Sequence, residues 1–129
     1  MKTIKQTYQI NSAINEVWKA LTLPGYINAW GGGPAKMDDK VGTKFSLWDG
    51  EIWGKNLEVM ENKKLVQEWW SKGELKDKPS TVTFTLKSED GKVRLDLVQT
   101  DVPEEHEKDL DDGWRDFYLL PLKKYLESK

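Results

Sequence analysis

The chain contains no cysteine and only one histidine, His106. Without thiols it can form neither disulfides nor thiolate metal sites, and its lone histidine has no second histidine with which to share a metal ion. No stretch approaches the roughly 20 apolar residues that a membrane span needs. The first residues do not include an apolar run of signal-peptide length. These absences predict a cytoplasmic protein with no membrane span, no metal and no cofactor.

The chain also lacks a surplus of positive charge, with 20 Lys and Arg against 22 Asp and Glu. Because nucleic acids are bound by basic surfaces, no nucleic-acid partner is expected. Nucleotide-binding glycine patterns and the Gly-x-Ser-x-Gly element of hydrolases are absent, and Gly31–Gly33 is not followed by the Lys-Ser/Thr of a phosphate loop. Because no acid–base cluster is recognisable, the sequence favours a binding protein over an enzyme. A monomer or weak dimer is expected.

Tryptophan is abundant, with seven in 129 residues, and the segments around it are clearly periodic. Residues 3–10 alternate between polar and apolar, which predicts a half-buried strand. Asn11-Ser12 supplies an N-cap for a short helix to about Leu21. A second short helix begins near Pro24, runs to about Trp30 and ends at the glycines that follow.

Five further strands are predicted over residues 43–48, 52–61, 65–71, 81–87 and 92–100, with a hairpin turn at Asp49-Gly50. Helical spacing then continues to the end of the chain, where Pro121 should bend the helix. A strongly curved antiparallel sheet must cover its concave face, and only this helix is long enough. The predicted fold is α+β, a single helix-grip (START-like) domain over residues 1–129. It has a curved antiparallel sheet of about six to seven strands around a long C-terminal helix, and two short helices after the first strand.

The interior between sheet and helix is predicted to be aromatic. The side chains expected there are Trp18, Trp30, Phe45, Trp53, Trp69, Phe84, Trp114, Phe117, Tyr118 and Tyr125. They either fill the space or line a pocket for an apolar ligand, and both interpretations stay open. An empty cavity of roughly 300 Å³ would cost about 7 kcal/mol, so aromatic side chains, water or a ligand must fill it. The candidate ligand-binding lining is Trp18, Trp30, Phe45, Trp53, Gln67, Trp69, Trp114 and Tyr118.

Three glutamines share strand faces with apolar residues, namely Gln6, Gln67 and Gln99. On the concave face they could orient the polar group of a ligand, because a buried amide without partners costs about 1–3 kcal/mol. Alternatively they lie near strand ends and contact water. A bulge near Asp49 or Gly54 would invert the parity on which this assignment rests.

Two further sets of residues are candidates for contacts with other proteins. Residues 101–112 hold seven acids beside His106, which suits an exposed loop and the first turn of a helix better than a catalytic or metal site. An acidic patch for a basic partner is the alternative. Trp48, Trp70, Leu119 and Leu120 fall opposite the inward sets, so they are either scattered surface residues or a protein–protein face.

Five segments together resemble one known family. They are INSAINEVWKALT, DDKVGTKFSLWDG, KLVQEWW, STVTFTLKSEDGKVRLDLVQTDVP and DDGWRDFYLLPLKKYLE. They are similar, in this order, to elements of the SRPBCC superfamily, and within it to the C-terminal domain of activators of the 90-kDa heat-shock protein's ATPase. The resemblance implies the helix-grip fold. For function it implies a hydrophobic small-molecule ligand as the first expectation, and a chaperone partner as the alternative.

Overall fold

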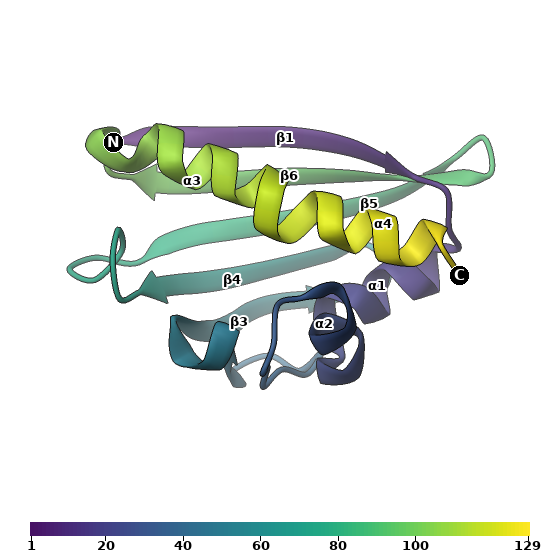
Figure 1. Cartoon of the computed structure of the whole chain (residues 1–129), viewed down its shortest axis with the longest axis horizontal. Coiled ribbons are helices and arrows are strands. Elements are labelled where there is room, and N and C mark those ends of the chain that lie inside the picture. Colours follow the sequence, from purple (N-terminus) through teal and green to yellow (C-terminus); the bar gives the residue numbers. More distant parts are fainter.

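Six antiparallel strands form one curved sheet in the order β1-β6-β5-β4-β3-β2 (Figure 1). The structure is a computed structural model and describes all residues from 1 to 129. The strands are β1 (Lys2–Ile10), β2 (Lys44–Leu47), β3 (Ile52–Met60), β4 (Lys64–Ser71), β5 (Ser80–Glu89) and β6 (Lys92–Val102). The sequence therefore predicted every strand to within a few residues, and six is the observed number.

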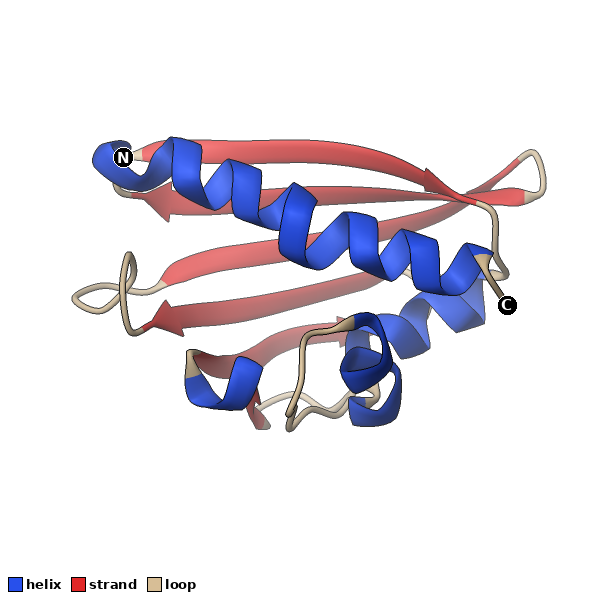
Figure 2. Cartoon of the chain, viewed as in Figure 1, coloured by secondary structure: helices blue, strands red, loops and turns tan.

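One long helical rod crosses the concave face of this sheet diagonally (Figure 2). After the short turn η2 (Glu104–His106) it consists of α3 (Glu107–Gly113), the π-helical turn η3 (Trp114–Leu119) and α4 (Leu120–Glu127). The two short helices, α1 (Ile14–Thr22) and α2 (Pro24–Trp30), lie beside the C-terminal end of the rod (Figure 1). The arrangement is the α+β helix-grip fold.

The two short helices begin and end for local reasons. Ala13, and not Asn11 or Ser12, is the N-cap of α1, and no side chain caps that end. Pro24 occupies the first turn of α2, where its missing N–H costs nothing. Gly31 ends α2 in the left-handed conformation, with φ of 111°, which glycine adopts without strain.

The core lies between the sheet and the helices. Apolar side chains from alternate positions of the strands meet apolar side chains from α1, α2 and the C-terminal rod in one continuous cluster. Phe84 and Tyr118, from β5 and η3, are buried at its centre with ring centroids 5.6 Å apart. Burial of such large side chains is the main stabilising contribution in a domain of this size.

Strand β3 presents a different face from the one predicted, so Trp53 does not reach the interior. Gly54 faces inward instead, and a Cβ atom there would lie 1.6 Å from the carbonyl oxygen of Glu68. Trp53 lies on the outer face, 38% exposed, opposite Trp70 of β4. The prediction followed the large aromatic residue, while the inward position belongs to a residue with no side chain. A register shift between Asn56 and Glu58 then inverts the parity further along β3.

The π-helical turn changes which residues of the rod are buried. The N–H of Leu120 donates to the carbonyl of Arg115, five residues earlier, so this turn contains one residue more than an α-helical turn. Leu119 is consequently buried and Phe117 is 67% exposed, the reverse of the α-helical prediction. Pro121 follows in the first turn of α4, where the absence of an N–H is tolerated.

Candidate functional site

A pocket of about 540 Å³ opens at the N-terminal half of the C-terminal rod. It lies between α3 and η3 on one side and, on the other, β4, the start of β3 and the 3₁₀ turn η1 (Trp48–Gly50). Its walls, called here the aromatic pocket, are formed by Trp48, Glu51, Ile52, Trp69, Glu74, Asp109, Leu110, Gly113, Trp114, Phe117 and Tyr118. The pocket is thus concave and mostly apolar, with a few polar groups, as is usual for small-molecule sites.

Interlocked rings form the deep wall of the pocket. The Trp69 and Trp114 centroids are 4.7 Å apart, and Tyr118 lies 4.9 Å from Trp114 and 6.0 Å from Trp69. Trp69 comes from β4, while the other two come from the π-helical turn. Because each ring restricts its neighbours, this wall is preorganised, which lowers the entropic cost of binding a ligand against it.

Trp48 reaches the pocket through an unusual backbone conformation. Its φ is 47°, and that of Asp49 is 55°. Left-handed conformations are unfavourable for bulky residues and persist only where surrounding contacts hold them. Here the Trp48 N–H donates to the Gly32 carbonyl at 2.8 Å, and the Asp49 N–H to the Pro34 carbonyl at 3.0 Å. The half-buried Trp48 ring consequently packs edge-on against Tyr118, at 6.2 Å.

Gly113 leaves part of the pocket wall without a side chain. Its backbone is ordinary right-handed helix, with φ of −62° and ψ of −40°. A Cβ atom at this position would have no heavy atom within 4 Å, so no close contact requires glycine. Glycine inside a helix destabilises it by about 0.5–1 kcal/mol relative to alanine. In the structure, the absence of a side chain at Gly113 leaves the pocket wall open at this position.

Carboxylates stand at the rim of the pocket. They are Glu51, Glu74 and Asp109, and no basic residue is part of the lining. Lys72 pairs with Glu51 at 3.8 Å, but both side chains are more than half exposed. Glu74 and Asp109 have no ion-pair partner, so the rim carries net negative charge above an apolar floor.

Four buried side-chain groups have no hydrogen-bond partner, namely the Tyr118 hydroxyl, the side-chain nitrogen of Gln99, the Trp18 indole N–H and the side-chain oxygen of Asn62. Tyr118 lines the pocket and is 1% exposed. Burial raises the pKa of its hydroxyl well above the ordinary value of 10, so it stays protonated and neutral. Buried polar groups without partners are uncommon, and enclosed water is the usual partner of such groups.

The two buried glutamines hold tryptophan rings in place. The Trp114 indole N–H donates to the Gln99 side-chain oxygen at 2.7 Å, and the Trp69 indole N–H donates to Gln67 at 2.8 Å. Gln67 in turn donates to the side-chain oxygen of Asn56 at 2.9 Å. Both amides lie on the concave face, but their oxygens are already used by tryptophans of the pocket wall. They therefore position the wall.

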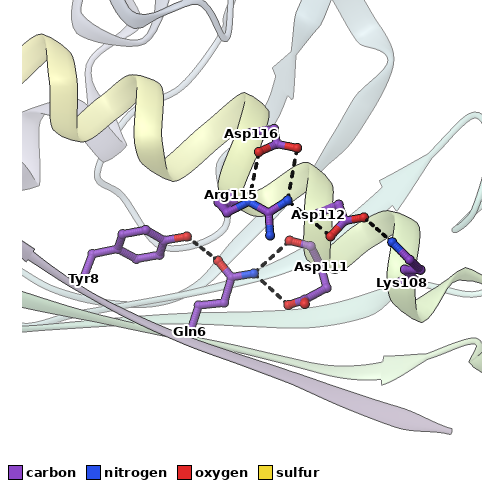
Figure 3. A network of polar contacts seen from close by, with 7 residues as sticks. All are labelled: Gln6, Tyr8, Lys108, Asp111, Asp112, Arg115 and Asp116. Carbon is purple, nitrogen blue, oxygen red and sulfur yellow. Dashed lines mark hydrogen bonds and ion pairs between the residues drawn. The ribbon is translucent and has the colours of Figure 1, made fainter.

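Gln6 is half-buried and ties α3 to β1 (Figure 3). Its side-chain nitrogen donates to the carboxylate of Asp111 at 2.7 Å and to the carbonyl of the same residue at 2.8 Å. The Tyr8 hydroxyl donates to the Gln6 oxygen at 2.7 Å. Figure 3 also shows Asp112, half-buried on the same helix, between Lys108 and Arg115. Because α3 also carries Asp109, Leu110 and Gly113, the Gln6 contact joins a pocket-lining helix to β1.

Three of the eight residues predicted from the sequence to line a ligand site meet at this pocket, namely Trp69, Trp114 and Tyr118. Trp30 packs behind Tyr118 at 4.6 Å and donates its indole N–H to the carbonyl of Ala20. Three others lie elsewhere: Phe45 packs against Trp69, Gln67 holds the Trp69 indole, and Trp53 is on the outer face. Trp18 lines a separate, smaller hollow of about 230 Å³.

Several lining residues were not identified from the sequence. Trp48 was assigned to the outer face because strand parity places it opposite Leu47, whereas Trp48–Gly50 form a 3₁₀ turn in which that parity ends. The acids of the rim and Gly113 carry no periodic signal that would separate them from surface residues. No group of three or more histidine or acidic side chains is placed to hold a metal ion, and no helix is both long and apolar enough to cross a membrane.

Comparison with known proteins identifies the fold and the family. Residues 11–127 match the family model described as "Activator of Hsp90 ATPase homolog 1-like protein". Among solved structures, an HSP90 activator from Plasmodium falciparum superimposes with a TM-score of 0.88 at 24% identity, covering 98% of this chain and 97% of that one. The Aha1 dimer from Colwellia psychrerythraea gives 0.85 at 18% identity, covering 98% and 97%.

The curated relatives are longer proteins. An uncharacterised protein of Schizosaccharomyces pombe is 30% identical over 93% of this chain and 36% of its own length. The human activator of 90 kDa heat shock protein ATPase homolog 1 is 24% identical over 94% of this chain and 35% of its own length. The chain thus spans about a third of the curated relatives that it matches. On the family match, which covers nearly all of the sequence, the chain belongs to the family of activator of Hsp90 ATPase homolog 1-like proteins.

Proposed function

We propose that the chain binds a hydrophobic small molecule in the aromatic pocket. The observation that carries this proposal is the opening of about 540 Å³ between η3, α3 and the sheet, within the usual range of roughly 300–1,000 Å³ for ligand sites. Behind the wall, Trp30 packs against Tyr118 and Phe45 against Trp69. The ligand would lie against Trp69 and Trp114 and be covered at the mouth by Phe117.

Two residues of the lining, Phe117 and Gly113, support a pocket that remains open to bind a ligand. Phe117 exposes 67% of a large apolar surface to water at the pocket mouth, where a bound molecule would cover it. Gly113 leaves the wall open although alanine would make a more stable helix. Both are unfavourable for stability alone and favourable for binding an apolar molecule.

A neutral fluorescent probe tests this proposal directly. N-phenyl-1-naphthylamine, whose emission rises in apolar surroundings, should bind saturably with one site per chain. Gly113→Leu should abolish most of this binding, because the added side chain occupies the pocket. Gly113→Ala is the matched control, since it changes the helix in the same way but adds only one methyl group.

Two further variants sharpen the localisation. Phe117→Ala should weaken the probe severalfold by removing apolar contact at the mouth, whereas Met60→Ala removes an exposed apolar side chain of β3 far from the pocket and should not. Equal probe affinity in Gly113→Leu and Gly113→Ala would refute the pocket as the binding site. If the pocket is supported by these variants, native mass spectrometry of protein purified from its own host would identify the natural ligand. The ligand would appear as an added mass that is lost on denaturation.

A second function, as a module that acts with a chaperone, is supported by the family and by one surface feature. Trp53 and Trp70 are direct cross-strand partners on the outer face of the sheet. Neither ring contributes to the core, and tryptophan is strongly enriched at the centres of protein interfaces. Leu119, a surface candidate from the sequence, is buried and is no longer part of this face.

The chaperone proposal is tested by a double substitution on that face. Trp53→Ala with Trp70→Ala should reduce binding to the host's 90-kDa chaperone and any effect on its ATPase, while neutral-probe binding in the pocket is unchanged. Val41→Ala, at an exposed apolar residue outside this pair, is the control. Absence of binding by the unmodified chain would count against this second function and leave the pocket proposal untouched.

A further inference from the structure

We infer that the aromatic pocket selects ligands that carry a positive charge on a hydrophobic body, such as an alkyl- or arylammonium. This inference rests on the proposed function, since it names the class of molecule that the same pocket would hold. It follows from two properties that the lining combines, a wall of aromatic rings and uncompensated negative charge.

The rings supply the first property. The lining contains the rings of Trp48, Trp69, Trp114, Phe117 and Tyr118, which come from three different elements of the chain, η1, β4 and η3. An ammonium group near the face of such rings is attracted by their quadrupole, most strongly by tryptophan. Three of the five rings are tryptophans, and sites that surround a cation with several aromatic rings are a recurring way to bind quaternary ammonium compounds.

The carboxylates supply the second property. Glu74 and Asp109 stand at the rim without an ion-pair partner, and the partner of Glu51, Lys72, is 3.8 Å away on the open surface. The basic residues nearest in sequence on α3 and η3 are engaged elsewhere, because Lys108 pairs with Asp112 and Arg115 with Asp112 and Asp116. The field at the mouth therefore attracts cations and repels fatty acids and other anionic lipids.

Tyr118 contributes to the pocket through its ring. Its hydroxyl is enclosed by the surrounding protein and has no hydrogen-bond partner, so it is not counted among the groups that a ligand would contact. The aromatic rings of the wall and the carboxylates at the entrance both favour the same ligand class.

The test compares two probes of equal shape. Benzyltrimethylammonium is cationic, and neopentylbenzene replaces its nitrogen with carbon. Tryptophan fluorescence of the full chain at low ionic strength should show binding of the cation about tenfold tighter than the neutral compound. Removing the rim charges with Glu74→Gln and Asp109→Asn should weaken only the cation, by about three- to tenfold.

A control variant separates local from general electrostatics. Glu58→Gln with Glu89→Gln makes the same change in net charge far from the pocket and should alter cation affinity less than about twofold, since distant exposed charges are screened. If the neutral probe binds as tightly as the cation, or if both double variants lose equal affinity, the charge selectivity is overturned while the pocket proposal stands. If neither probe binds, both proposals fail.

Discussion

The two ends of the C-terminal rod are anchored in different ways. At the α4 end, Leu122 and Leu126 are buried, Tyr125 packs edge-on against Tyr26 at 5.9 Å, and Lys129 pairs with Glu16 at 3.1 Å. At the α3 end no residue is buried. The side-chain hydrogen bonds that join α3 to the sheet are those from Gln6 to Asp111. The stable end holds the fold together, and the lightly anchored end carries the pocket.

This division matches what binding requires. Segments that admit ligands are drawn from the least stable parts of a structure, because entry needs local opening at low cost. A pocket at the α4 end would require displacement of buried leucines, whereas α3 can move away from β1 by breaking the contacts of one glutamine. The comparison therefore predicts that substitutions at the two ends differ in size and in kind.

The largest expected difference is between two leucines. Leu122→Ala, in the core of α4, should lower the free energy of unfolding by about 2–5 kcal/mol, because it leaves a cavity. Leu110→Ala, on half-buried α3, should cost only about 1 kcal/mol, since less apolar surface is lost from the interior. Urea denaturation of both variants measures this, and equal losses would contradict the division into two ends.

The next effect concerns the contact between α3 and the sheet. Gln6→Ala should lower the free energy of unfolding by about 1 kcal/mol, because Asp111 loses its hydrogen-bond partner. Hydrogen exchange should become faster at the amides of α3 and remain unchanged in α4. Gln9→Ala, at an exposed side chain of the same strand, should change neither rate. Uniform acceleration along the rod would mean that the rod opens as a unit.

A substitution at Gly113 should act in the opposite direction. Gly113→Ala is expected to raise the free energy of unfolding by about 0.5–1 kcal/mol, because a right-handed helical residue with open space around its Cβ position gains helix propensity. Thermal denaturation followed by circular dichroism measures the shift. A loss of stability would show that glycine is needed at this position for a reason other than the width of the pocket.

The smallest effect should appear in acid at the α4 end. The Asn11 N–H, and then Lys123, lower the pKa of Glu127 below its ordinary value of 4.5. The ionised form is favoured in the folded protein, so its contribution is present above that value and is lost as pH falls through the lowered pKa. Glu127→Gln should remove about a few tenths of a kcal/mol at neutral pH and little at pH 3. An equal loss at both pH values would exclude an ionic contribution.

The fold could be predicted because its signals are local and repeated. Alternation in β5 and β6, Pro24 at the start of α2 and the apolar spacing of the rod each point to one structure. The errors in predicting buried residues lie where a one-residue irregularity changes which face of a strand or helix is turned toward the core. Gly54 faces inward without any hydrophobic signal, and the π-helical turn exchanges Phe117 and Leu119. No periodicity rule that assumes regular elements can locate such changes.

The candidate site was harder to predict because it depends on where the interior remains unfilled. Trp69, Trp114 and Tyr118 followed from strand parity and helix spacing, yet their neighbours Trp30 and Phe45 share the same pattern and are simply packed. Trp48 depends on two left-handed residues, Trp48 itself and Asp49. Such conformations are set by contacts with Gly32 and Pro34, distant from the turn in sequence.

The extra residue of the π-helical turn divides the rod into two helices with different phase. Before it, Leu110 and Gly113 face the pocket; after it, Leu122 and Leu126 face the core. A change of chain length in this turn would therefore do what no single substitution can, because deleting one residue would rotate the pocket-lining half by about 100° relative to the anchored half. Relatives that differ by one residue here would keep the buried leucines of α4 and present a different set of side chains to a ligand.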